Sequence, residues 1–109
     1  MKLIIAIVQD EDASQLISTL MTEGFSVTKL ATTGGFLKAG NTTLLIGVKD
    51  DKLDACLKLI ESLCKSRKQI ATTPVTMGGA AGMYTPYPIE VTVGGATVFV
   101  LNVDSFIKM

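Results

Sequence analysis

The sequence contains no histidine and no tryptophan, and it has only two cysteines and three prolines among its 109 residues. Without histidine, the chain cannot form a Ser-His or Cys-His nucleophile pair, nor a zinc or iron site that depends on histidine ligands. An enzyme built from this sequence would have to rely on carboxylates, lysine or tyrosine, and the acidic residues form no convincing acid–base pair. We therefore expect no catalytic residues, no metal, no cofactor and no enzymatic activity.

An excess of charge of either sign is also absent. Ten basic and ten acidic residues give a formal net charge of zero, and Arg67 is the only arginine. A protein that neutralises many phosphates of a long nucleic acid normally carries a basic excess, so we expect no DNA or RNA partner. A small ligand with one or two phosphates remains compatible, because backbone amides and hydroxyl groups can hold it.

Long hydrophobic runs and cysteine motifs are missing as well. The opening apolar run, residues 3–8, is much shorter than the roughly 20 residues that cross a membrane as a helix. Cys56 and Cys64 form no CxxC motif and fall on or near the apolar stripe of a predicted helix, which favours core packing over redox chemistry. Two thiols and the lack of a signal peptide predict a cytoplasmic protein without membrane insertion.

The chain does have a high apolar content, with 48% hydrophobic residues against 18% charged residues. A chain of this length is expected to form one domain over residues 1–109, with a modest core. Surplus apolar surface on a small domain suggests that it makes contacts with other subunits.

The order of hydrophobic patterns predicts a ferredoxin-like α+β fold. Apolar residues at helical spacing follow the acidic residues at 10–12 and 50–51, where capping accounts for the acidic side chains. Six strands are expected, at residues 3–8, 25–33, 42–48, 69–75, 89–93 and 96–103. This β-α-β-β-α-β order with an added C-terminal strand predicts an antiparallel sheet with both helices on one face.

Glycines mark the expected connections between these elements. Gly24 is placed to cap the first helix, and Gly94-Gly95 is expected to close a hairpin between the last two strands. Residues 76–86 are interpreted as a long flexible loop of the kind that serves as a lid or binds a partner. The last strand is apolar at nearly every position, and two helices cannot cover both faces of a sheet, so we expect a second subunit.

The glycine-rich hairpin tip, residues 32–41, is the strongest candidate for a binding site. Its glycines allow successive N–H groups to converge on an anion. Phe36 and Leu37 are large apolar residues where a turn is normally polar, and they fit either a stacking platform for a flat ring or a contact with another chain. The Asn41 amide both donates and accepts, as reading an adenine edge requires, although closing the hairpin also explains it.

Four segments carry a resemblance to a known family: residues 29–43, 77–79, 87–88 and 93–100. Over its whole length the sequence resembles the bacterial PII-like cyclic di-AMP receptors. The resemblance implies a homotrimer that binds cyclic di-AMP between adjacent subunits, changes loop order on binding and signals to an unidentified downstream protein. Matching positions imply the following ligand-binding residues: Val27, Thr28, Gly35, Phe36, Leu37, Asn41, Gly47 and Phe99.

The sequence departs from this family at Gly24-Phe25-Ser26, where its members often have Asn-Phe-Arg. A polar side chain and a cation are therefore missing beside the expected ligand. Two alternative functions remain at this point, a nitrogen-type PII regulator that binds ATP and a structural trimer without a nucleotide. The short segment between the second and third strands and the lack of a basic phosphate-binding segment speak against the first.

Overall fold

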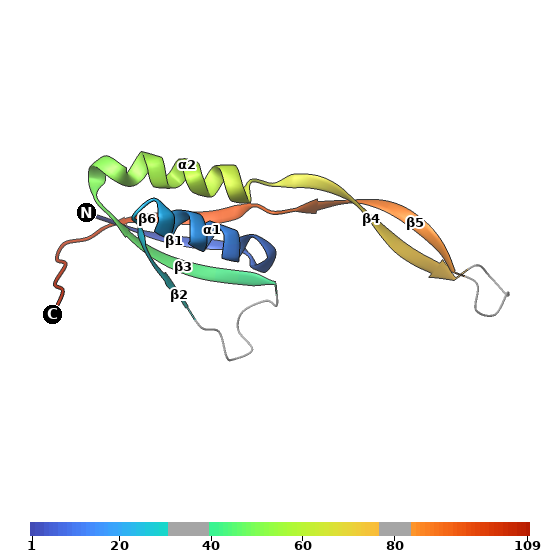
Figure 1. The fold of residues 1–109 in the computed structure, drawn as a ribbon, viewed down its shortest axis with the longest axis horizontal. Helices are drawn as coiled ribbons and strands as arrows, with labels where there is room; N and C mark the ends of the chain where they lie inside the picture. Colours follow the sequence, from blue (N-terminus) through green and yellow to red (C-terminus); the bar gives the residue numbers. More distant parts are fainter. Residues whose placement is uncertain (31–39, 77–83) are drawn as a thin grey trace.

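The computed structural model describes residues 1–30, 40–76 and 84–109, which form a four-stranded antiparallel sheet with two helices and a separate two-stranded ribbon (Figure 1). The strand order in the larger sheet is β2-β3-β1-β6, which confirms the predicted ferredoxin-like α+β arrangement. The elements in chain order are β1 (Lys2–Gln9), α1 (Asp10–Thr22), β2 (Ser26–Lys29), β3 (Asn41–Val48), the 3-10 turn η1 (Asp50–Lys52), α2 (Leu53–Cys64), β4 (Arg67–Thr76), β5 (Tyr84–Val93) and β6 (Ala96–Asn102).

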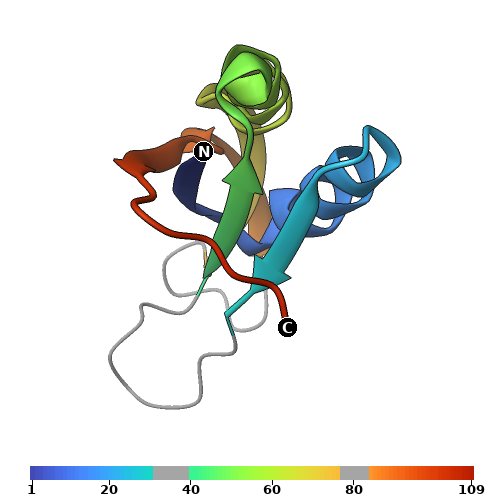
Figure 2. The same cartoon turned by 90° about the vertical axis from the view of Figure 1, so that its left-hand side faces the viewer.

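The core lies between the larger sheet and the two helices, which both pack on one face of the sheet (Figure 2). Along β1, Ile4, Ala6 and Val8 are buried while the residues between them are only half-buried, as the two-residue period of a strand requires. The helical residues that complete the core are Leu16, Leu20, Cys56, Ile60 and Cys64.

Both cysteines are buried in this core, which confirms the packing role expected for them. Burial raises the pKa of the Cys56 thiol to about 11, and it also raises the pKa of Cys64. The thiolate is the reactive form of cysteine, so this environment keeps both side chains unreactive.

The acidic residues at the start of α1 do not cap the helix, and that interpretation is wrong. The N-cap residue is Gln9, and it makes no side-chain capping hydrogen bond. The Asp10 carboxylate instead accepts a hydrogen bond from the Thr42 hydroxyl on β3. Asp12 is only 7% exposed and forms an ion pair with Arg67, 55 residues further along the chain. These acids therefore hold distant segments together, although their charge still suits the helix dipole.

β4 and β5 pair with each other in one register, from Arg67 opposite Val93 to Thr76 opposite Tyr84, and we call this ribbon the arm. The arm extends away from the larger sheet (Figure 1). It raises the radius of gyration to 18.9 Å, against about 13 Å for a globular chain of about 100 residues. The expected loop at 76–86 is corrected accordingly, because residues 76 and 84–86 belong to strands, while residues 77–83 lie outside the described part of the chain.

The hairpin expected around Gly94-Gly95 is also wrong. β5 pairs with β4, and β6 pairs with β1, where Leu101 lies opposite Leu3. Both glycines have positive φ, +80° and +94°, and they carry the chain from the arm into the larger sheet. The Gly95 amide donates a hydrogen bond to the Cys64 carbonyl, so the two glycines join the arm to the core instead of closing a turn.

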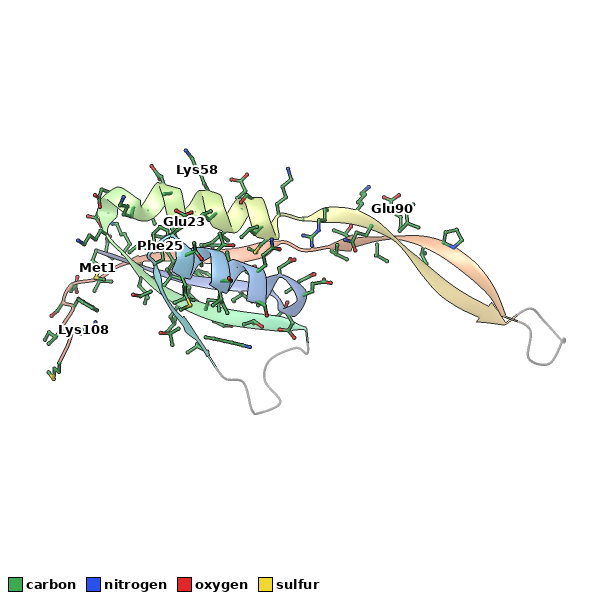
Figure 3. The ribbon with its side chains drawn as sticks, in the orientation of Figure 1. Met1, Glu23, Phe25, Lys58, Glu90 and Lys108 are labelled. Atoms are coloured by element: carbon green, nitrogen blue, oxygen red, sulfur yellow. The ribbon has the colours of Figure 1, made fainter. Side chains whose placement is uncertain are left out.

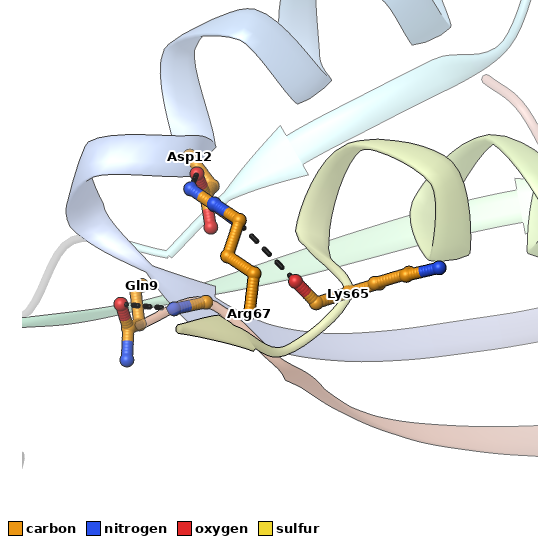
Figure 4. Close-up of polar contacts among 5 residues, drawn as sticks. Gln9, Asp12, Lys65 and Arg67 are labelled. Carbon is orange, nitrogen blue, oxygen red and sulfur yellow. Dashed lines mark hydrogen bonds and ion pairs between the residues drawn. The ribbon is translucent and has the colours of Figure 1, made fainter. Parts of the chain in front are cut away.

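Polar contacts hold the base of the arm, by which we mean Arg67 at the start of β4 and Gly94 just after β5 (Figure 4). The Gly94 amide donates to Gln9 Oε1 at 2.8 Å, and Arg67 Nη2 lies 2.9 Å from Asp12 Oδ1. Arg67 Nη1 also donates to the Lys65 carbonyl at 3.2 Å. The hydrogen bond to Asp12 raises the pKa of the Arg67 guanidinium above its ordinary value. The first strand of the arm and the end of its second strand are therefore both tied to the segment where β1 meets α1.

Gly94→Ala should destabilise the protein more than a glycine substitution at a similar φ elsewhere. A Cβ at position 94 would lie 2.5 Å from Arg67 Nη1 and 2.8 Å from the Lys65 carbonyl oxygen. We expect a loss of about 2–5 kcal/mol in the free energy of unfolding, from the left-handed backbone and from overpacking.

Gly24→Ala is the matched control, because Gly24 has φ +90° and a Cβ there would meet nothing within 4 Å. It should cost only about 1–2 kcal/mol for the left-handed backbone. Urea unfolding of both variants measures the difference in the free energy of unfolding. An equal decrease in the two variants would show that the surroundings of Gly94 accommodate a methyl group.

Candidate functional site

The face of the larger sheet that the helices leave open carries several of the residues assigned to ligand binding. Strand pairing places Thr28 opposite Leu45, Leu45 opposite Ile5, and Ile5 opposite Phe99, so these four side chains form one row across the sheet. Paired residues point to the same side of a sheet. Ile4, the neighbour of Ile5, is fully buried under the helices, so the row faces away from them.

Asn41 and Gly47 share this face, because they lie at even spacings from Leu45 along β3. Asn41 pairs with Gln9 at the start of the strand, and Gly47 pairs with Ser26 near its end. A Cβ at position 47 would lie 3.3 Å from the end of the Met1 side chain, so a larger residue would crowd this point. The structure therefore places Thr28, Asn41, Gly47 and Phe99 on one surface.

These residues do not all meet within one chain. Thr28 lies on β2 and Phe99 on β6, which are the opposite edges of the sheet, three strand spacings or about 14 Å apart. Phe99 is 52% exposed. Val27 pairs with Ile46 and packs against the core, so its side chain lies on the helix-covered side and only its backbone reaches the open face. Gly35, Phe36 and Leu37 lie outside the described residues.

The start of β3 is fixed by the first residues of α1. The Asp10 amide donates to the Gly40 carbonyl at 2.8 Å, and the Asp10 carboxylate accepts the hydrogen bond from Thr42. Gly40 has φ +104°, a left-handed conformation that favours glycine where the chain enters the strand. Asn41, between these two residues, is therefore held from both sides, and its position depends on α1.

A cavity of about 820 Å³ is lined by the segment that follows α1, by the end of β3 and by α2, at the end of the core away from the arm. Figure 3 shows Met1, Glu23, Phe25 and Lys58 at this end of the molecule. The cavity reaches the segment Gly24-Phe25-Ser26, together with Gly47. A volume of this size suits a small-molecule ligand.

Three lysines line the cavity, Lys49, Lys52 and Lys58, together with the acidic Glu23. The sequence analysis missed these lysines, because they follow no helical period: three residues separate Lys49 from Lys52, and six separate Lys52 from Lys58. All three are exposed: Lys49 lies between β3 and η1, Lys52 ends η1, and Lys58 lies on α2. They line the same cavity as Ser26.

Other kinds of site are not evident in the residues that the structure describes. No group of three or more histidine, cysteine, aspartate or glutamate side chains gathers there in a way that could hold a metal ion. Among the two helices described, neither is long and apolar enough to cross a membrane.

The fold and the site define a ferredoxin-like α+β protein with four of its candidate ligand residues, Thr28, Asn41, Gly47 and Phe99, on an open sheet face. A family model described as cyclic-di-AMP receptor matches residues 1–109, and the chain therefore belongs to this receptor family. Among solved structures, it is similar to a functionally unknown protein from Pediococcus pentosaceus ATCC 25745. The two sequences are 42% identical, the match covers 99% of this chain and 96% of the other, and the TM-score is 0.77.

Proposed function

We propose that this chain is a signal-transduction receptor that binds cyclic di-AMP in clefts between the subunits of a homotrimer. The observation that carries the proposal is the placement of Thr28 and Phe99 at opposite edges of one sheet face. A cleft between two copies brings the β2 edge of one chain towards the β6 edge of the next. Family residues that are separated within one chain then meet around one ligand.

The apolar character of the open face supports assembly. Leu3, Ile5 and Leu45 lie half-buried on this face, and Phe99 and Leu101 are 52% and 45% exposed on β6. Covering such surface stabilises an assembly by about 25 cal/mol for each Å² of apolar area removed from water. A contact between two different edges is heterologous, and a ring of copies is the arrangement that closes it. The family resemblance implies a ring of three.

The spread of polar groups along β3 supports a ligand with two bases and two phosphates. Asn41 and Gly47 are six residues apart on one strand, which corresponds to about 20 Å. The Asn41 amide is able to donate to and accept from an adenine edge, and the Thr28 hydroxyl is able to donate to a phosphate. Exposed lysines around the cavity add attraction for anions.

The proposed output is a change in loop order that a downstream protein reads in the cytoplasm, without catalysis. The arm supports this role, because an isolated two-stranded ribbon is only marginally stable in water. Segments with few contacts to the core are those whose order responds most readily to a ligand or partner. The identity of the downstream protein does not follow from the chain.

The assembly should depend on the open face of β6. Leu101→Lys places a charge on that face, opposite Leu3, and should convert the trimer into smaller species. Val100→Lys is the matched control, because Val100 is 43% exposed on the same strand but pairs with Ile4 on the helix-covered side. Light scattering after size exclusion measures the mass. A monomeric wild-type protein at micromolar concentration would refute the trimer and the site between subunits.

Cyclic di-AMP should bind the wild-type protein, and ATP should bind much more weakly. Asn41→Ala should weaken cyclic di-AMP binding by about 1–3 kcal/mol, because a buried adenine edge would lose its amide partner. Calorimetry with both nucleotides measures these affinities. Equal affinities would favour a nitrogen-type PII regulator, and a trimer that binds neither nucleotide would be a structural protein.

Ser26→Arg should tighten cyclic di-AMP binding, because it restores the cation that relatives often carry beside the ligand. A charge-assisted hydrogen bond contributes roughly 1.5–3 kcal/mol, which is on the order of tenfold to a hundredfold in affinity. The gain should shrink as the salt concentration rises. Gly24→Asn should help less, because a neutral hydrogen bond contributes less.

Ser62→Arg is the control for general attraction, because Ser62 lines the same cavity from α2. The wild-type protein, Ser26→Arg and Ser62→Arg are each titrated with cyclic di-AMP at low and high salt. The comparison separates a specific contact with the ligand from a general electrostatic attraction. The same gain from both arginines would mean that position 26 does not touch the ligand.

A further inference from the structure

One residue, Gln9, contacts both the candidate ligand site and the base of the arm. Its backbone pairs with Asn41 in the ladder between β1 and β3. Its side-chain oxygen accepts a hydrogen bond from the Gly94 amide at 2.8 Å, at the point where the chain leaves the arm (Figure 4). A shift in the first residue of β3 therefore reaches the second strand of the arm through a single side chain.

The two aspartates that follow extend this connection in both directions. Asp10 binds the chain at the start of β3, through the Gly40 carbonyl and the Thr42 hydroxyl. Asp12 lies in the same turn of α1 and binds Arg67, the first residue of β4. Residues 9–12, which we call the junction, thus hold the start of β3 on one side and both strands of the arm on the other.

The contacts at the arm base are tight enough to transmit a displacement. The space beside Gly94 is filled by the Arg67 guanidinium and the Lys65 carbonyl, which a Cβ would meet at 2.5 and 2.8 Å. The space that a side chain at position 94 would need is therefore already occupied by Arg67 and the backbone of Lys65. Closely packed groups of this kind carry strain from one element to the next.

One oxygen of the Asp12 carboxylate is unpaired in the observed arrangement of the described residues. Its Oδ2 atom is buried and has no hydrogen-bond partner among the described residues, although Oδ1 binds Arg67. A buried carboxylate oxygen without a donor is unfavourable. Coupling between sites requires a second arrangement of the arm, and one that brings a donor to Oδ2 would remove that penalty.

We propose that the junction couples the ligand site to the arm, so that a ligand held at Asn41 changes the orientation or order of the arm through Gln9, Asp10 and Asp12. The ligand's identity in this statement rests on the proposed function, whereas the coupling is a property of the chain without any ligand. Because coupling is reciprocal, a partner bound to the arm would change the ligand affinity by the same factor.

The first experiment measures the coupling without a ligand, by amide hydrogen exchange. Thr42→Val removes the hydroxyl that donates to Asp10 and keeps the shape of the side chain. It should accelerate exchange at Gly94 and in residues 67–70 and 90–93 by about threefold to tenfold, relative to amides of the core strand β1.

Thr43→Val is the matched control, since Thr43 is also buried on β3 but no hydrogen bond of its side chain is found among the described residues. It should leave exchange in the arm unchanged. Equal effects of the two substitutions on the arm, or no effect of Thr42→Val, would overturn the proposal.

The second experiment adds cyclic di-AMP and compares two substitutions of Gln9. Gln9→Glu keeps an acceptor oxygen for the Gly94 amide, whereas Gln9→Met has a similar length and offers no comparable acceptor. In the wild-type protein and in Gln9→Glu, the rate of amide hydrogen exchange in the arm should change when the ligand binds. Gln9→Met should still bind in calorimetry, and thermal melts should show that it is folded, but its arm should not respond.

The outcomes separate the two proposals. A full arm response in Gln9→Met would overturn the coupling and leave the receptor function intact. Failure of the wild-type protein to bind cyclic di-AMP would contradict the proposed function, and the comparison of Thr42→Val with Thr43→Val would then decide the coupling alone.

Discussion

Two helices cover only one face of the four-stranded sheet, and the rest of the molecule depends on this limit. They bury one set of alternating residues on β1 and leave Ile5 and its neighbours half-buried on the other face. Thr28 and Asn41 lie among those apolar residues. In the proposed assembly, the apolar surface that a second copy would cover also carries the candidate ligand residues. A ligand that binds only the assembled form would therefore stabilise that form by mass action.

Local patterns in the sequence predicted the elements well, but they predicted strand pairing poorly. The strand expected at 3–8 and the cap at Gly24 agree with the structure, because both depend on neighbouring residues. Two glycines between β-branched segments look the same whether the flanking strands fold together or separate. Segments that are distant in the sequence decide the pairing: β6 pairs with the edge of β1, and β5 pairs with the ten-residue strand β4.

The same distinction between local and distant causes applies to the candidate site. Acidic residues at a helix start suggest capping, and nothing near Asp12 in the sequence points to Arg67, which is 55 residues away. Once the register is known, strand alternation places Thr28 and Phe99 on the same face. The register itself depends on pairing between strands that are distant in the sequence. The open face was predictable as a consequence of the fold class, whereas the junction at residues 9–12 and the lysine-lined cavity required the structure.

The positive charge around the cavity comes from lysines, and β2 carries no arginine. An arginine at position 26 would stand on a strand, where its planar guanidinium presents several donors in a fixed geometry. This chain instead has Lys49, Lys52 and Lys58 on exposed, flexible stems around a cavity that also contains Glu23. Exposed ammonium groups attract a phosphate without fixing it in one geometry, and salt screens exposed charges more strongly than buried ones. In a receptor of this kind, the lysines around the cavity would attract the anionic ligand, and the contacts on β3 would give selectivity between nucleotides.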